Sequence, residues 1–167
     1  VTELVTDVDI VRSQILIAEG YPLSDPRIGI KSQKDVHQNG YSIQCRVTTE
    51  DPANNFAPDT GTIEVYRSSS GHGIRLDSGN AYAGAQISPF YDSLLVKIVA
   101  YNRTFQGTID TAIRCLHETK IKGVKTNIGF LINVLNHPRF RNGECDTSFI
   151  AQTPELFDIH GGDNMEK

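Results

Sequence analysis

Residues 41–52 read Tyr-Ser-Ile-Gln-Cys-Arg-Val-Thr-Thr-Glu-Asp-Pro, and this stretch decides the fold. Apolar and polar side chains alternate along it, and the apolar set is Tyr41, Ile43, Cys45 and Val47. A period of two is typical of a strand that buries one face. Arg46 belongs to the polar set, so we expect its side chain to point out of the sheet. Asp51-Pro52 follows closely and ends the strand.

Other segments predict the rest of an antiparallel sheet. Strand patterns recur at Thr62–Arg67, Gly73–Asp77 and Leu94–Tyr101. The last run is apolar nearly throughout, so we expect it to be covered on both faces. Glycines separate these runs and indicate turn connections between the strands.

Helical spacing of apolar residues indicates segments that flank this sheet. The segments are Asp7–Glu19, Ile109–Leu116, Ile128–Leu135 and a short helix after Pro154. Asp7 or Asp9 can cap the first helix, and Gly20 stands where a helix stop belongs. Helices outside an antiparallel meander place the chain in the α+β class.

Composition excludes several classes of protein. The 167 residues carry 16 Lys and Arg against 20 Asp and Glu, a net charge of −4, which provides no general basic surface for nucleic acid or an anionic membrane. The longest apolar runs, such as Ile15–Ala18, fall far short of the ~18 residues of a transmembrane helix. Three widely separated cysteines predict a reducing compartment, and they and the five histidines show no metal-ligand spacing.

Two arginines on the predicted strands each allow two interpretations. A guanidinium on a rigid strand is always charged and fixed in direction, so Arg46 can stabilise a developing oxyanion. The alternative is a surface arginine paired with Glu50 or Asp51. Arg75 shares a strand face with Asp77, so an intrastrand pair and a contact with a partner both stay open.

Two polar loops are also candidates for chemistry. Ser68–Gly73 precedes a strand and lacks the motif of a phosphate-binding loop or a serine nucleophile, so it predicts a turn. Asp92 stands where a loop enters the apolar run Leu94–Tyr101. It either lines a site or caps a turn.

Longer motifs carry a resemblance to a known family. Residues 41–52 resemble a motif in the C-terminal subdomain of biotin carboxylase, and the form Gln-Cys-Arg-Val-Thr-Thr is more similar to pyruvate carboxylases than to acyl-CoA carboxylases. Further matching stretches are Phe56–Gly61, Gly73–Asp77, Ile87–Lys97 and Gly123–Ile128. Val1–Val5 is similar to the residues that follow the family segment N-P-R-I-Q-V-E-H, and the resemblance covers residues 1–159.

The resemblance implies part of a pyruvate carboxylase, an ATP-dependent carbon–carbon ligase. Such an enzyme carboxylates biotin with ATP and bicarbonate and passes the carboxyl group to pyruvate, giving oxaloacetate. The chain then divides into a helix at residues 1–20 that continues from the ATP-grasp region, the biotin carboxylase C-terminal subdomain at 21–159 and a polar tail at 160–167. We expect the tail to be disordered.

The same resemblance implies roles for particular residues. Arg46 matches the arginine that faces the ureido anion of biotin, and Asp92 matches an aspartate beside the biotin pocket, so both are candidate catalytic and biotin-binding residues. Thr147 lies near a position that borders the adenine. Arg75 matches a contact across a two-fold subunit interface, and His72 replaces an aromatic interface residue.

The implied partners are the remainder of the biotin carboxylase domain, a biotin carrier domain and further copies in a homo-oligomer, with no nucleic acid and no membrane. Biotin would belong to the carrier domain, and ATP with Mg or Mn would bind mostly to residues outside this chain. The expected location is the cytoplasm, or the mitochondrial matrix in a eukaryote. The alternative function is a non-catalytic assembly module of the same carboxylase or of a related acyl-CoA carboxylase.

The chain begins at Val1 without a methionine or a signal peptide, so we expect it to be cut from a longer protein. The resemblance places the ATP-grasp lysines, the glycine-rich lid, the metal-binding glutamates and the catalytic base before Val1. We therefore predict that the isolated chain releases no phosphate from ATP in the presence of bicarbonate and free biotin. A phosphate-release assay checks this, and turnover by the isolated chain would contradict it.

Overall fold

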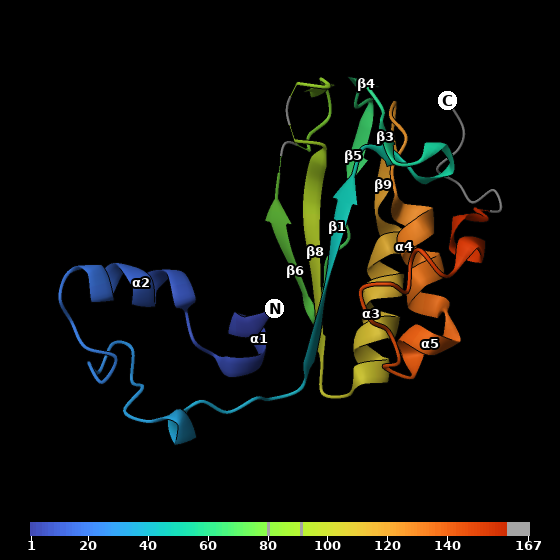
Figure 1. Cartoon of the computed structure of the whole chain (residues 1–167). Coiled ribbons are helices and arrows are strands. Elements are labelled where there is room, and N and C mark those ends of the chain that lie inside the picture. The colour runs from blue at the N-terminus through green and yellow to red at the C-terminus, as the bar shows by residue number, and fades with distance from the viewer. Residues whose placement is uncertain (80, 91, 160–167) are drawn as a thin grey trace.

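The computed structural model describes residues 1–79, 81–90 and 92–159, so the tail predicted at 160–167 lies outside the described residues. Figure 1 shows an N-terminal arm, residues 1–40, that extends from a body in which helices pack beside a sheet. In the described part of the chain, no helix has the length and apolar character needed to cross a membrane.

The arm contains the short helix α1 (Thr2–Thr6), helix α2 (Ile10–Ala18) and the 3-10 turn η1 (Gln33–Asp35). The helix expected over Asp7–Glu19 is α2, and Asp9 caps it by accepting a hydrogen bond from the Arg12 amide at 2.9 Å. Asp7 does not cap α2. It ends α1 instead, in a left-handed conformation with a φ of 57°.

The central sheet consists of β1 (Tyr41–Thr48), β8 (Leu94–Asn102) and β6 (Ile74–Ser78), in that order, and both outer strands run antiparallel to β8. Consecutive residues of a strand point to opposite faces. Ile98 and Val99 on β8 are nevertheless both at most 1% exposed. The expectation that this strand is covered on both faces is therefore confirmed.

Short strand pairs extend the body beyond this sheet. They are β2 (Glu50–Asp51) with β3 (Ala57–Pro58), β4 (Gly61–Thr62) with β7 (Gln86–Ile87), and β5 (Val65–Arg67) with β9 (Lys120–Lys122). The single strand expected over Thr62–Arg67 is wrong, because the backbone changes partners in the middle. The Ile63 amide donates to the Ala85 carbonyl, whereas the Glu64 amide donates to the Lys122 carbonyl.

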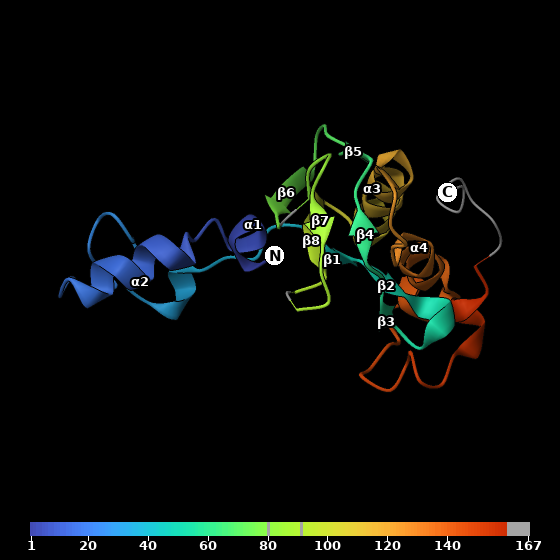
Figure 2. The ribbon, with the colours of Figure 1, turned by 90° about the horizontal axis from the view of Figure 1, so that it is seen from above.

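Helices α3 (Phe105–Glu118) and α4 (Ile128–Asn136) stand on one side of the sheet, and the arm leaves from the other side (Figure 2). Ile109 and Leu116 of α3 are fully buried in the core. The helix α5 (Pro138–Arg141) follows α4, and the short helix expected after Pro154 is η3 (Pro154–Phe157). The α+β class is confirmed, with β8 in the middle of the antiparallel sheet.

Gly123 lies at a close approach between two segments. Its φ is +97°, and a Cβ there would overlap the carbonyl oxygen of Thr62, whereas Gly84 has a similar φ of +92° with open space around it. We predict that Gly123→Ala lowers the free energy of unfolding by more than about 2 kcal/mol, because overlap adds to backbone strain. Gly84→Ala introduces the backbone strain without the overlap, so we expect it to cause the smaller loss. Urea unfolding compares the two variants, and equal losses would contradict the prediction.

The thiol of Cys45 makes the stability of the core depend on pH. Cys45 is 4% exposed, and burial raises its pKa from 9.0 to about 12. Between these two pKa values the unfolded chain loses the thiol proton while the folded chain keeps it. The contribution of the buried Cys45 thiol to the free energy of unfolding is therefore complete below pH 9.0 and is lost as the pH rises toward about 12. We predict that the stability difference between wild type and Cys45→Ala shrinks over this window, with a slope approaching about 1.4 kcal/mol per pH unit. Urea unfolding at several pH values measures it, and a constant difference would contradict it.

Candidate functional site

Arg46 lies on a polar face of the central sheet. Its register partner is Lys97 on β8, and Lys97 is in turn the partner of Asp77 on β6. Residues directly opposite one another across a ladder project to the same face, so these three residues form one row across the sheet. Cys45 and Ile98, the adjacent residues, project to the opposite face and pack in the core.

The Arg46 side chain is exposed, and within residues 1–79, 81–90 and 92–159 it has no hydrogen-bond or ion-pair partner. The alternative of a pair with Glu50 or Asp51 is wrong, because no described hydrogen bond or ion pair joins Arg46 to either residue, and both carboxylates bind other groups. Glu50 accepts hydrogen bonds from the Thr48 hydroxyl at 3.2 Å and the Ser93 hydroxyl at 2.9 Å. The guanidinium of Arg46 is thus available to an anionic or carbonyl oxygen.

Lys97 is a half-buried neighbour of Arg46 that the sequence interpretation missed. Its ammonium group has no ion-pair partner in the part of the chain that the structure describes. Asp77, across the ladder, accepts its hydrogen bond from Arg75 Nε instead. The missed signal is Lys97 itself, which is the one charge in the apolar run Leu94–Tyr101.

Asp92 lies at the entrance to β8, where its Oδ1 accepts a hydrogen bond from the Leu94 amide at 2.9 Å. The turn-cap alternative is therefore present in the structure. Register pairs Arg46 with Lys97, and no described contact joins the Asp92 carboxylate to Arg46. The two candidate residues thus lie along the same pair of strands but are not directly linked.

Thr147 lies exposed in the loop between α5 and η3. Its neighbour Asp146 accepts hydrogen bonds from both the amide and the hydroxyl of Ser148. Phe149, two residues on, packs in a second apolar cluster with Phe130 and Leu156. Among the described contacts, none connects Thr147 to Arg46 or Asp92, so the structure does not bring the three together.

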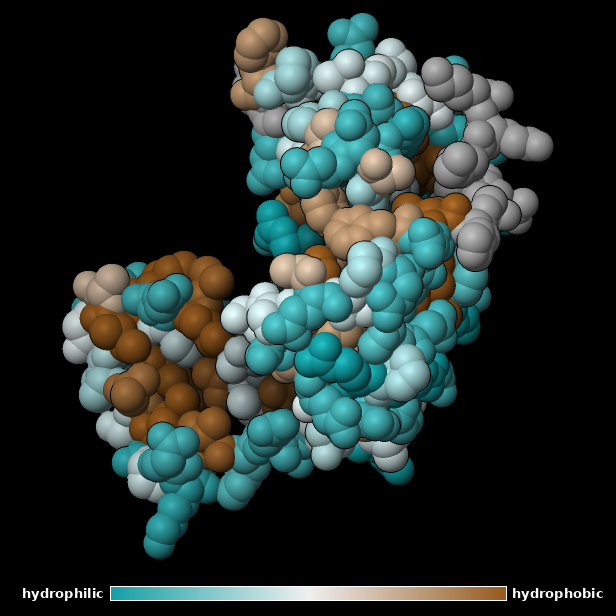
Figure 3. Space-filling model, turned by 45° about the vertical axis from the view of Figure 1, so that its right-hand side comes forward, coloured by the Kyte–Doolittle hydropathy of each residue, from teal (hydrophilic) through white to brown (hydrophobic). Residues whose placement is uncertain are grey.

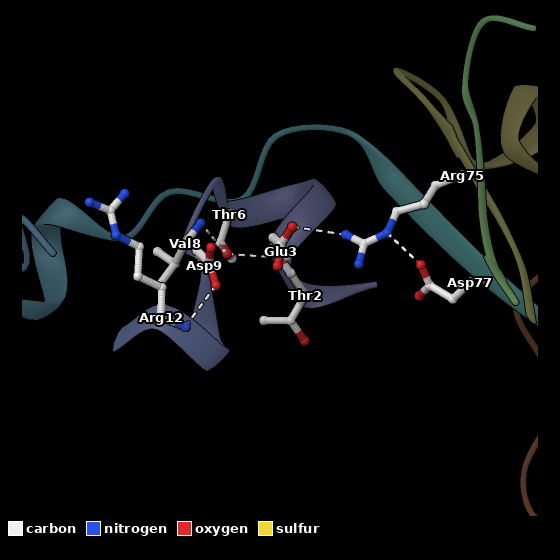
Figure 4. Close-up of polar contacts among 8 residues, drawn as sticks. All are labelled: Thr2, Glu3, Thr6, Val8, Asp9, Arg12, Arg75 and Asp77. Atoms are coloured by element: carbon white, nitrogen blue, oxygen red, sulfur yellow. Dashed lines mark hydrogen bonds and ion pairs between the residues drawn. The ribbon is translucent and has the colours of Figure 1, made fainter. Parts of the chain in front are cut away.

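The two candidate interface residues lie at and after the turn that precedes β6. His72 is exposed between Gly71 and Gly73, and the turn expected at Ser68–Gly73 is present. In Figure 4, Arg75 lies between Glu3 and Asp77. Its Nη1 donates to the Glu3 carboxylate at 2.8 Å and its Nε to Asp77 at 2.8 Å, and these bonds, that to Asp77 first, raise the pKa of Arg75. The intrastrand pair therefore exists, and Arg75 also ties the arm to the sheet.

A lysine holds the loop before α4 against the β2–β3 strand pair. Lys125 Nζ binds the Asp51 carboxylate at 2.6 Å, which raises the pKa of Lys125, and its amide donates to the Asp59 carboxylate at 2.6 Å.

No group of three or more His, Cys, Asp or Glu side chains in the described ranges is placed to hold a metal ion. The row on the polar face holds two basic side chains, Arg46 and Lys97, and one carboxylate, Asp77.

Comparison with known sequences identifies the family. Residues 44–152 match the model of the biotin carboxylase C-terminal domain. The chain is 54% identical over 159 residues to a pyruvate carboxylase of Staphylococcus aureus and 52% identical over 164 residues to the mitochondrial pyruvate carboxylase of Homo sapiens. These alignments cover 95% and 98% of this chain but only 14% of each relative.

Solved structures agree with the sequences. The complete multifunctional pyruvate carboxylase of Rhizobium etli matches with a TM-score of 0.91 and 48% identity, covering 98% of this chain and 16% of that one. The biotin carboxylase domain dimer of Hydrogenobacter thermophilus 2-oxoglutarate carboxylase matches with a TM-score of 0.88 and 40% identity, covering 96% of this chain and 34% of that one. The chain therefore belongs to the biotin carboxylase C-terminal domain family and aligns with the biotin carboxylase part of pyruvate carboxylases.

Proposed function

We propose that this chain supplies part of the biotin site in the biotin carboxylase unit of a pyruvate carboxylase. The whole enzyme would carboxylate biotin with ATP and bicarbonate and then convert pyruvate to oxaloacetate. The observation that carries the proposal is Arg46, a guanidinium without a carboxylate partner in the described chain, on a strand inside the segment that matches the family.

Arg46 has the chemistry to stabilise negative charge that develops on an oxygen atom. Its guanidinium is charged at any working pH and presents several donors in a fixed plane. The ladder with β8 holds the backbone of β1 in place. The guanidinium of Arg46 therefore needs to move little when negative charge develops on the oxygen of a bound substrate. Lys97, its partner across the ladder, adds a second positive charge to the same face.

Biotin fits this face, because its ureido oxygen can accept hydrogen bonds from the guanidinium N–H groups of Arg46 that have no described partner. When bound, biotin supplies the nitrogen that takes up the carboxyl group. Asp92 would line the same pocket from the start of β8, and Thr147 would border the adenine of ATP. In line with the family resemblance, Mg or Mn would be held mostly by residues outside this chain.

The arm supports the proposal of a protein partner. Apolar side chains gather on its surface in Figure 3. Those on α2 are 42% to 65% exposed and comprise Ile10, Val11, Ile15 and Ile17. Exposed apolar surface of this kind is typical of a docking surface. The relatives are longer, and the biotin carboxylase domain of the 2-oxoglutarate carboxylase extends well beyond the matched part. We therefore propose that the remainder of the biotin carboxylase domain covers α2.

Further partners would complete the enzyme. We propose a biotin carrier domain that delivers biotin to Arg46, and further copies of the carboxylase in a homo-oligomer. The matched domain of 2-oxoglutarate carboxylase is described as a dimer. Because the relatives include bacterial proteins and a mitochondrial one, the proposed location is the cytoplasm or the mitochondrial matrix, according to the source.

The site proposal predicts a selective loss of rate. In a full-length carboxylase that contains this chain, Arg46→Ala should lower the carboxylation of free biotin by about 100-fold or more, as expected for loss of a preorganised donor. The oligomer should stay intact. Arg103→Ala is the matched control, because Arg103 is exposed in the turn after β8 and its guanidinium has no described partner. An unchanged rate in Arg46→Ala would show that the site is assigned wrongly.

An assembly role is the second candidate function, favoured by the exposed Arg75 close to His72. Arg75→Glu would replace the positive charge of the proposed subunit interface with a third carboxylate beside Glu3 and Asp77. We therefore expect weaker subunit association before any loss of rate. Sedimentation velocity measures the association. Glu3→Ala is the control, because it removes the contact with the arm and leaves Arg75 in place. An intact oligomer in Arg75→Glu would exclude the interface role.

A further inference from the structure

Asn127 has an unusual place at the start of α4. It is the N-cap residue of this helix, yet its side chain makes no capping hydrogen bond. Asn is among the residues that most favour this position because its side-chain oxygen normally accepts from the first helical amides. The carboxamide of Asn127 is turned toward β1 instead, and the residue is 7% exposed.

The carboxamide bonds to the backbone on both sides of Val47. Its Oδ1 accepts a hydrogen bond from the Thr48 amide at 2.9 Å, and its Nδ2 donates to the Arg46 carbonyl at 3.0 Å. The backbone amide of Asn127 donates in addition to the Thr48 carbonyl at 3.3 Å. The side chain thus acts as a peptide group would in a neighbouring strand, with one donor and one acceptor.

The position on β1 explains why such a clamp is needed. β1 is an edge strand of the central sheet, so its outer backbone groups have no strand partner in that sheet. The ladder with β8 also shifts register between Val47 and Thr48, one residue after Arg46. Asn127 provides hydrogen-bond partners for the backbone amide of Thr48 and the carbonyl of Arg46 at this irregular point of the outer edge. Lys125 holds the loop that carries Asn127 through its bonds to Asp51 and Asp59.

We propose that Asn127 is a positioning residue that fixes the backbone of Arg46 and so directs its guanidinium toward the reacting oxygen. This inference rests on the proposed function of Arg46. No described side chain holds the guanidinium, so its direction depends on the backbone from which it projects. Both hydrogen bonds of the Asn127 carboxamide go to the backbone of β1, so the proposed effect on Arg46 is transmitted through that strand.

The test uses a full-length carboxylase that contains this chain, with free biotin as the probe. Asn127→Ala removes both side-chain bonds, and Asn127→Asp keeps the size and the acceptor for Thr48 but loses the donor to the Arg46 carbonyl. We expect each variant to lower kcat for carboxylation of biotin by about 10- to 100-fold, as for small misplacement of a catalytic group. The KM for ATP and the bicarbonate-dependent ATP cleavage without biotin should stay unchanged.

Asn133→Ala is the matched control on the same helix. Its side chain also bonds to two backbone carbonyls, of Leu156 at 3.0 Å and Asp158 at 3.2 Å, away from β1. We expect its kcat to stay near that of wild type. An equal loss in Asn133→Ala would mean that the stability of α4 is responsible and would overturn the proposal.

A double-mutant cycle with Arg46 separates positioning from a general structural role. In the Arg46→Ala background, Asn127→Ala should cause no further loss, because the group that it positions is gone. Additive losses would overturn the proposal, as would a wild-type rate in Asn127→Asp. If Asn127→Ala does not fold, Asn127→Asp decides the question in the same cycle. An unchanged rate in Arg46→Ala would refute the proposed function, whereas a low rate there with normal Asn127 variants would refute only this inference.

Discussion

The burial of β8 on both of its faces is the constraint on which the body of the molecule depends. β8 pairs with β1 on one edge and β6 on the other, and Ile98 and Val99 are buried on opposite faces. A slip of one residue would bring Lys97 into the core, where an unpaired charge is costly, so the register is strongly specified. The same register places Arg46, Lys97 and Asp77 in one row.

In this arrangement, one face of β1 packs in the core and the other carries the side chain proposed to act on biotin. Cys45 and Val47 pack in the core, and Arg46 between them projects to the other side. The charge therefore rests on a strand that the core holds in place, and Asn127 closes the outer edge at the same point. In the proposed function, the backbone of this strand positions the guanidinium, for which the described residues provide no partner. We propose that the exposed apolar side of α2 and the face that carries Arg46 both contact other parts of a longer protein.

Elements with a strong local pattern could be predicted from the sequence. β1 and β8, the two longer helices of the body and the outward direction of Arg46 all follow from periodicity within a few residues. The break within Thr62–Arg67 could not be predicted in this way, because the strand β5 depends on β9, which lies more than fifty residues later in the chain. Lys97 was visible as a charge in an apolar run, but its place beside Arg46 required the register.

The sequence by itself determined the α+β class, the face of the strand on which Arg46 lies, and the family, because alternation and contiguous motifs are local properties. Only the tertiary structure decided that Glu50 and Asp51 bind other groups and that no described residue pairs with Arg46. It also decided that Arg75 joins the arm to the sheet and that Asn127 clamps β1 instead of capping α4. These contacts join residues about forty to eighty positions apart, and side chains at such separations meet only after the core has brought their backbones together.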